Sequence, residues 1–314
     1  MYRIGIDLGG TNIVAGVVDE DYTIVATAKC KTAAPRPVDD ILSDIARTAR
    51  QAVENAGLTM EDIAGIGIGS PGICNADTGM VERANNIGFH FVPVTEKLEA
   101  LLGKEVHLEN DANAAAYGEL LAGAAKGKRN CVCITLGTGV GGGVVVEGKI
   151  VAGFNFAGAE LGHTVIVADG EPCNCGRRGC WETYASATAL IRQTKQAMDA
   201  HPDSLMWALS DNGTAVNGLT AFDGMRQGDP AATAVVDTYI RYVACGLINM
   251  INIFQPEVIC IGGGICHEGE TLLAPLRRLA DIEDFNRNGA RRTEIKTAQL
   301  GNDAGIIGAA FLGQ

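Results

Sequence analysis

The distribution of glycine constrains the fold of this chain more than any other feature of its sequence. Glycine supplies 41 of the 314 residues, about twice the usual share of roughly 7%, and it gathers in short clusters inside apolar runs. Three clusters, in residues 7–12, 136–139 and 262–264, follow Ile-, Val- or Leu-rich segments with the composition of strands. Glycine at a strand end permits a tight turn or the close approach of a ligand to the backbone. We therefore expect several strands that end in turn-forming or ligand-binding loops.

The order of predicted elements repeats in the two halves of the chain. In the first half, strands are expected at 2–8, 12–18, 22–30, 63–69 and 105–109, and helices at 39–56 and 96–102, the latter capped by Thr95. In the second half, the expected elements are a helix at 111–123, strands at 130–136, 141–147 and 149–152, a helix at 230–254 and a strand at 257–261. The polar segment 201–228 is expected to be an insertion in the second domain. The repeat indicates an internal duplication, with a ligand in the cleft between the halves.

Charge and composition argue against nucleic acid and membrane as partners. Lys and Arg total 25 against 37 Asp and Glu, which gives a net charge of −12, and no basic run of five residues occurs. No apolar stretch reaches 18 residues without a polar interruption, so no membrane span is expected. Met1 leads at once into a predicted strand, so no signal peptide is expected. Ten cysteines, seven of them scattered, are typical of a cytoplasmic protein.

The three glycine loops are candidate phosphate sites. Successive backbone N–H groups in a glycine turn form a nest for an anion, and Asp7 beside the first loop could hold Mg²⁺. A plain hairpin turn explains any single loop equally well, but three loops at strand ends favour phosphate binding. Two Gly-x-Gly-x-x-Gly spacings, at 67–72 and 137–142, do not fit a dinucleotide site. Pro71 interrupts the first, and a further strand rather than a helix follows the second.

Three clustered cysteines indicate a metal site. Cys173, Cys175 and Cys180 combine with His163 in the spacing H-x9-C-x-C-x4-C. Three thiolates and one imidazole complete a closed tetrahedral Zn²⁺ site, which has a structural role because no coordination position is left for water. Free buried thiols and a redox pair are the alternatives.

Asp111 is the candidate catalytic group. It lies where the strand expected at 105–109 passes into the helix expected at 111–123. A carboxylate at that junction could accept the proton of a reacting hydroxyl. The same residue could instead do no more than cap the helix that it opens.

Taken together, the motifs of this chain resemble those of the ROK sugar kinases, and in particular those of the bacterial ROK glucokinases. The motifs are Asp7-x-Gly9-Gly10-Thr11, residues 109–115 (ENDANAA), residues 136–143 (LGTGVGGG), Cys173-x-Cys175-Gly176-x-x-Gly179-Cys180-x-Glu182 and residues 305–310 (GIIGAA). The resemblance covers essentially the whole chain in order. It implies an α/β fold of the actin/hexokinase-like (ribonuclease H-like) kind, duplicated into two domains with a central ligand cleft.

The resemblance also implies where the domains lie. A smaller N-terminal α/β domain is expected at 1–110 plus 300–314, and a larger α/β domain with the zinc loop at 111–299. Repressors of the same family that respond to sugars carry a further helix-turn-helix domain at the N-terminus. Because this chain opens at the first strand of the kinase fold, we expect no such domain.

By the same resemblance, Asp111 is the catalytic base. The expected sugar contacts are Gly72, Asn110, Asp111, Glu160, His163 and Glu182. A solvated surface carboxylate is the alternative for Glu160 and Glu182. The residues expected to bind Mg²⁺ and nucleotide are Asp7, Gly9, Gly10, Thr11, Asn12, Gly137, Thr138, Gly139, Gly263 and Gly264, with Asn302-Asp303-Ala304 also near the adenosine. Asn12 stands where many relatives carry Lys, so a lysine contact to phosphate is not expected there.

The sequence therefore predicts an ATP-dependent hexose kinase of carbohydrate metabolism that phosphorylates the 6-hydroxyl of glucose. ATP, Mg²⁺ and a structural Zn²⁺ are the expected cofactors, and the resemblance implies a homodimer or homotetramer. One alternative is another sugar: fructose, mannose, allose or N-acetylmannosamine. A second is a sugar-sensing protein without catalysis. A third is a nicotinamide-dependent oxidoreductase, which the hairpin setting of the glycine motifs disfavours.

Overall fold

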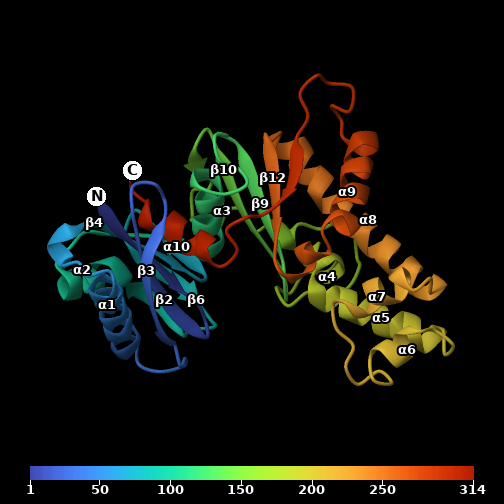
Figure 1. The fold of residues 1–314 in the computed structure, drawn as a ribbon, viewed down its shortest axis with the longest axis horizontal. Helices are drawn as coiled ribbons and strands as arrows, with labels where there is room; N and C mark the ends of the chain where they lie inside the picture. The colour runs from blue at the N-terminus through green and yellow to red at the C-terminus, as the bar shows by residue number, and fades with distance from the viewer. The chain divides into compact units, whose positions relative to one another are not determined.

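A computed structural model describes all 314 residues, which form two compact units. The first contains residues 1–133, 143–159 and 298–314, and the second contains residues 134–142 and 160–297 (Figure 1). This grouping places residues 111–133 in the first unit, whereas the sequence suggested a boundary after residue 110. The reason is a close helix pair: a Cβ added to Gly118 or Gly308 would meet the backbone carbonyl of the opposite helix.

The first unit is built on two sheets. Its strands are β1 (Tyr2–Leu8), β2 (Asn12–Val18), β3 (Ile24–Lys31), β4 (Ile63–Ser70), β5 (Ile73–Asn75), β6 (Met80–Ala84), β7 (Phe89–Pro93) and β8 (Val106–Asn110). Its helices are α1 (Val38–Asn55), the 3-10 turn η1 (Met60–Asp62), α2 (Val94–Leu102), α3 (Asp111–Leu121) and α10 (Asp303–Ala310). One sheet has the order β3-β2-β1-β4-β8, and β5-β6-β7 form a second, antiparallel sheet.

Alternation along β1 and β4 decides which helix covers which face of the larger sheet. Gly5 and Gly67 contact the backbone of α10 so closely that a Cβ on either would meet a carbonyl oxygen of that helix. Their neighbours point to the opposite face. There Ile4, Ile6 and Ile68 belong to a buried cluster with the apolar stripe of α1. The sheet is therefore covered by α10 on one face and by α1 on the other.

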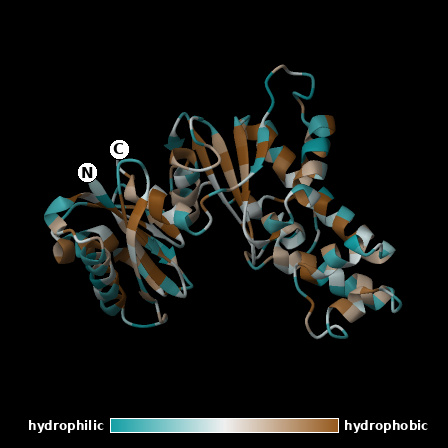
Figure 2. Ribbon diagram, in the orientation of Figure 1, coloured by the Kyte–Doolittle hydropathy of each residue, from teal (hydrophilic) through white to brown (hydrophobic).

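The second sheet has the order β11-β10-β9-β12-β13. Its strands are β9 (Cys131–Leu136), β10 (Val140–Val146), β11 (Lys149–Ile150), β12 (Val258–Gly262) and β13 (Glu294–Thr297). By the unit bounds above, β11 and residues 143–146 of β10 belong to the first unit. Outside this sheet, the second unit contains η2 (Leu161–His163), α4 (Glu182–Ala185), α5 (Ala187–Ala200), α6 (Met206–Leu209), α7 (Thr220–Arg226), α8 (Pro230–Phe254), η3 (Gly264–Glu268) and α9 (Glu270–Glu283). Figure 2 shows hydrophobic residues along these strands and on one side of the helices.

The helix α8 forms the core of the second unit. It begins as predicted at Pro230, after Asp229, whose side chain accepts hydrogen bonds from two backbone N–H groups of the first turn. By length and composition α8 is the one helix that could cross a membrane, but 56% of its most apolar window is buried inside the protein. Tyr239 of α8 is fully buried beside the core. Packing inside the protein therefore accounts for the apolar composition of this helix.

One expectation about local structure was wrong. The second helix starts at Val94 rather than Glu96, and Pro93, not Thr95, precedes it, because the chain passes directly from β7 into α2. The segment 201–228, expected as an insertion, contains helices α6 and α7, and Phe222 of α7 is fully buried. The expected α/β class is confirmed, and each of the two five-stranded sheets combines parallel and antiparallel pairs.

Candidate active site

The carboxyl ends of the parallel strands β1, β4 and β8 bring Asp7 and Asp111 close together in the first unit. In the register of β1, β4 and β8, Asp7 is opposite Gly69, and Gly69 is opposite Glu109. Ligands of open α/β sheets bind at this end of the strands. A Cβ built on Gly69 would lie 3.4 Å from the Cα of Asp111. Gly69, which the sequence singled out only as part of a Gly-x-Gly-x-x-Gly spacing, therefore lies directly beside the backbone of Asp111.

The first glycine loop is a tight hairpin between β1 and β2, with Leu8 opposite Ile13. The end of β3 holds it in place. The Thr32 hydroxyl donates to the Gly9 carbonyl at 2.6 Å, and the Thr32 N–H donates to the Thr11 carbonyl at 3.0 Å. Thr32 is fully buried, and because it is distant in sequence, sequence reasoning missed it.

A lysine also reaches this loop from β3. Lys31 is opposite Asn12 in the strand register, and its Nζ donates to Asn12 Oδ1 at 3.0 Å. The loop therefore has a cation beside it although residue 12 is not a lysine. The signal that could have found Lys31 is its position at the end of the strand that pairs with β2.

Asn110, rather than Asp111, caps helix α3. Its Oδ1 accepts from the backbone N–H of Ala112 at 2.9 Å and of Asn113 at 3.2 Å. Its Nδ2 donates to the Gly72 carbonyl at 3.1 Å, and Gly72 has a φ of +90°. The alternative in which Asp111 only caps the helix is therefore wrong. Asn110 ties the loop at residue 72 to the start of α3.

Burial changes the acidity of both carboxyl groups. Burial raises the pKa of Asp111, although the backbone N–H of Ala112 opposes this shift by donating to Asp111 Oδ1 at 2.9 Å. Burial, with the nearby charge of Asp111, raises the pKa of Asp7 to about 6. A carboxylate with a raised pKa is a stronger proton acceptor than an ordinary one.

In the second unit, the loop at 137–139 adjoins Glu182. A Cβ on Gly139 would meet Glu182 Oε2, and the same oxygen accepts from the N–H of Val140 at 3.2 Å. Gly263, with a φ of +87°, lies so close to the backbone of Leu136 that a Cβ would meet its carbonyl. The structure thus places the predicted nucleotide residues Gly137, Thr138, Gly139, Gly263 and Gly264 in one region.

A cavity of about 440 Å³ opens beside this loop, lined by Thr138, Gly139, Glu182, Arg192 and residues at the start of α5. The hydroxyl of Thr188 donates to the Thr138 carbonyl at 2.8 Å. A turn with glycines beside a helix start is a suitable site for an anion.

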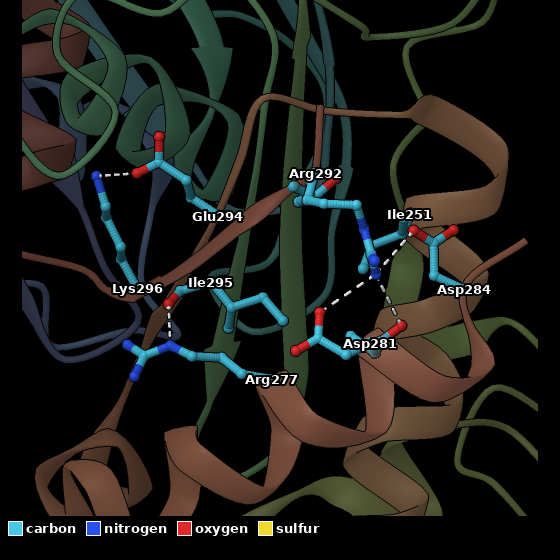
Figure 3. Close-up of a pocket in the computed structure, with 10 residues that line it drawn as sticks. Ile251, Arg277, Asp281, Asp284, Arg292, Glu294, Ile295 and Lys296 are labelled. Carbon is cyan, nitrogen blue, oxygen red and sulfur yellow. Dashed lines mark hydrogen bonds and ion pairs between the residues drawn. The ribbon is translucent and has the colours of Figure 1, made fainter. Parts of the chain in front are cut away.

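A second cavity, of about 330 Å³, contains none of the predicted site residues. It lies between α8, α9 and β13, where Arg292 extends between Asp281, at 3.3 Å, and Asp284, at 3.4 Å (Figure 3). Lys296 on its wall pairs with Glu294. Because these charges neutralise one another, this cavity is a poor candidate for a charged ligand.

The predicted metal ligands come together. The donor atoms of His163, Cys173, Cys175 and Cys180 all lie within 4.8 Å of one another. Cys173 Sγ is 3.6 Å from His163 Nδ1, and the sulfur atoms of Cys175 and Cys180 are also 3.6 Å apart. Tetrahedral Zn²⁺ with ordinary bond lengths separates such donors by roughly 3.5–3.8 Å. The four residues therefore fit Zn²⁺, and the fourth donor, His163, favours a metal over a redox pair.

This cluster is directly connected to the predicted sugar residues. Glu182 Oε1 lies 3.6 Å from Cys173 Sγ and 3.9 Å from His163 Nδ1. Glu160 is exposed and immediately precedes η2, where its carbonyl accepts from the His163 N–H at 3.1 Å. The metal ligands thus fix the backbone on which Glu160, His163 and Glu182 lie.

Known proteins resemble this chain over nearly its whole length. The ROK family model matches residues 3–314. The chain is 42% identical to a glucokinase of Streptomyces coelicolor over 98% of its length and 96% of that protein, and 39% identical to a glucokinase of Thermotoga maritima with the same coverage. Among solved structures, a ROK glucokinase of Streptomyces griseus in complex with glucose and AMPPNP is 38% identical, with a TM-score of 0.79 over 99% of both chains.

These matches also confirm the expected actin/hexokinase-like fold. They extend over nearly the full length of the chain and of each relative. The chain therefore belongs to the ROK family, as a glucokinase-like sugar kinase.

Proposed function

We propose that this protein transfers the γ-phosphate of ATP to the 6-hydroxyl of glucose. The observation that carries the proposal is that Asn110 caps α3, so the Asp111 carboxylate, whose pKa is raised by burial and which accepts the Ala112 N–H, is not required as the helix cap. The glucose and AMPPNP of the Streptomyces griseus structure support the choice of both substrates.

In this proposal Asp111 accepts the proton of the 6-hydroxyl as its oxygen attacks the γ-phosphorus of ATP. The bond between that phosphorus and the bridging oxygen breaks, so ADP leaves and glucose 6-phosphate forms. Phosphoryl transfer depends mainly on positioning and charge stabilisation, so one well-placed base suffices.

The remaining polar residues hold the two substrates. Gly72, Asn110, Glu160, His163 and Glu182 contact the sugar hydroxyls, since a carboxylate can accept from two hydroxyls at once. One ring nitrogen of His163 would be a metal ligand, which leaves the other to form a hydrogen bond with a sugar hydroxyl. The loops at 9–12 and 137–139 hold the phosphates of ATP, with adenosine near Gly263 and Gly264. Bound Mg²⁺ beside Asp7 would neutralise charge on these phosphates.

We assign a structural Zn²⁺ to His163, Cys173, Cys175 and Cys180, supported by the spacing of their donor atoms. The role of the metal is to fix the backbone from Glu160 to Glu182. The ten cysteines form no disulfide, and we propose that the protein acts in the reducing cytoplasm, where thiols stay reduced. Association into homodimers or homotetramers stays a prediction from the family, and light scattering tests it.

The experiment is a measurement of ADP release with MgATP across glucose, fructose, mannose, allose and N-acetylmannosamine. We expect the highest kcat/KM with glucose. Faster turnover of another sugar would identify that sugar as the substrate and would refute glucose. Sugar binding without turnover on any sugar would instead indicate a sensor.

A further inference from the structure

Glu119 is a buried acidic residue to which the reaction above assigns no role. It lies near the end of α3 with a side chain only 2% exposed. Burying a carboxylate destabilises the folded state unless hydrogen bonds replace its hydration. The surroundings of this side chain must therefore contain donors placed to receive it.

Three backbone N–H groups from two separate segments supply these donors. Glu119 Oε1 accepts from the N–H of Gln299 at 2.9 Å and from that of Leu300 at 2.8 Å. Oε2 accepts from the N–H of Ala124 at 2.8 Å. All three donors lie outside regular helices and strands. One carboxylate therefore fastens the turn after α3 and the segment that precedes α10.

Only a carboxylate satisfies this arrangement. Because both oxygens face N–H groups, an amide in the same position would direct its own NH₂ at a donor. The turn is also shaped around the side chain, since a Cβ on Gly123 would meet Glu119 Oε2. An aspartate would be too short by one methylene to reach both segments.

The segment held by Glu119 leads directly to the acidic pair. Leu300 is three residues before α10, and a Cβ on Gly305 in the first turn of α10 would lie 3.7 Å from Asp7 Cγ. At the other end, Glu119 is on the helix that Asp111 opens. A Cβ on Gly118 or Gly308 would meet a carbonyl oxygen of the opposite helix, so α3 and α10 touch through their backbones.

We propose that Glu119 is a positioning residue for the Mg-nucleotide side of the active site: it sets the register of α10 against α3 and thereby holds the start of α10 against Asp7. The inference rests on the proposed kinase function for its link to turnover, but nucleotide binding tests it separately. Loss of the carboxylate lets the start of α10 move away from Asp7. Affinity for Mg-nucleotide and turnover then fall, while affinity for sugar does not.

The test uses the full-length variant Glu119→Gln, with binding of MgAMPPNP and of glucose measured by calorimetry and KM and kcat measured with MgATP. We expect the Kd for MgAMPPNP to rise five- to twentyfold and kcat to fall, with the Kd for glucose within twofold of wild type. Asp229→Asn is the matched control: Asp229 is 4% exposed and receives the N–H of Leu205 at 2.6 Å and of Ala231 at 2.8 Å in the other unit. This control should lower the Tm and change neither Kd.

A Glu119→Gln protein with a lowered Tm but unchanged MgAMPPNP binding and kcat would show that Glu119 only stabilises the fold, and would overturn the proposal. If this variant does not fold, Gly123→Ala takes its place, because it pushes a methyl group against Glu119 Oε2 and keeps the charge. It should raise the Kd for MgAMPPNP in the same direction, and an unchanged Kd would again overturn the proposal. If wild-type protein binds MgAMPPNP but phosphorylates no sugar, the proposed function fails while the Glu119 comparison still decides this inference.

Discussion

Asp7 and Asp111 are coupled across a single glycine. Asp7 is opposite Gly69 in the register of β1 and β4, and a Cβ on Gly69 would lie 3.4 Å from the Cα of Asp111. After burial, the charge of Asp111 is the second cause that raises the pKa of Asp7 to about 6. Two carboxylates so placed repel each other in the free protein, and a cation between them and the phosphates would relieve this repulsion.

Removing the charge of Asp7 should stabilise the protein and remove its nucleotide affinity. Because the folded state holds the Asp7 proton more tightly, stability falls as pH rises from about 4 to about 6 and stays reduced above that window. We expect Asp7→Asn to raise the free energy of unfolding on the order of 1–2 kcal/mol at pH 7.5 and to give little change at pH 4. Urea denaturation without nucleotide or divalent metal measures this free energy of unfolding at both pH values. Asp21→Asn is the control, because Asp21 is exposed. An equal gain at both pH values would contradict the coupling.

Lys31 should contribute to ATP binding through its charge. Its Nζ lies 3.0 Å from Asn12 Oδ1, at the loop assigned to phosphate. We expect Lys31→Ala to raise the KM for MgATP about three- to tenfold, since a hydrogen bond to a charged group contributes about 1.5–3 kcal/mol when desolvated and less when exposed. Lys29→Ala, two residues earlier and also exposed, should leave it unchanged. Adding Asn12→Lys to the Lys31→Ala variant should restore the KM for MgATP. If Lys31→Ala leaves this KM unchanged and the added lysine does not lower it, Lys31 is excluded from the site.

Removing the metal should weaken sugar binding and stability together. Wild-type protein should contain one zinc per chain by mass spectrometry, and Cys173→Ser should lose it. Burial raises the pKa of the Cys173 thiol to about 12 in the metal-free protein, so rebinding zinc should release protons, which calorimetry in two buffers detects. Cys245→Ser, at an exposed thiol outside the cluster, is the control. A metal-free protein with the wild-type Kd for glucose would refute the link between the metal and Glu160, His163 and Glu182.

The packing of Trp181 against α8 should make Gly246 intolerant of a side chain. Trp181 is fully buried and stands between Cys180 and Glu182 in the sequence. Its indole N–H donates to the Tyr242 carbonyl at 2.8 Å. A Cβ on Gly246 would meet its ring. Gly246→Ala should therefore cost about 1–3 kcal/mol from overpacking, although alanine is the better helix former by about 1 kcal/mol. A Tm at or above that of wild type would contradict this packing.

The sequence allowed strands β1–β4 and β8–β12 and helices α1, α2, α3 and α8 to be predicted, because glycine turns, apolar periodicity and the Asp229-Pro230 start of α8 are local signals. Helices α5 and α9 and strand β13 were not predicted. The sequence also grouped His163 with three cysteines from spacing alone. It missed the sheet β5-β6-β7, whose short strands carry little periodicity. The partners of the loops, Thr32 and Glu119, were also missed, because their hydrogen bonds join segments 23 and 180 residues apart.

The sequence also could not show that Asn110, rather than Asp111, caps α3. Either residue type is a common helix cap, so sequence could not decide which of two neighbours accepts the N–H groups of α3. The structure decides it through the direction of the Asn110 side chain, which reaches Ala112 and Asn113.

The central claim is that Asp111 takes the proton of the sugar hydroxyl, and the most direct test is kcat for glucose with MgATP in wild type and Asp111→Asn, with the phosphorylated position identified by NMR. Asparagine keeps the size of the side chain but cannot accept that proton. We predict glucose 6-phosphate as the product of wild type, a fall in kcat of at least a hundredfold in Asp111→Asn, and a Kd for glucose within a few fold. A variant that retains most of its kcat, or a product phosphorylated at another hydroxyl, would contradict the account.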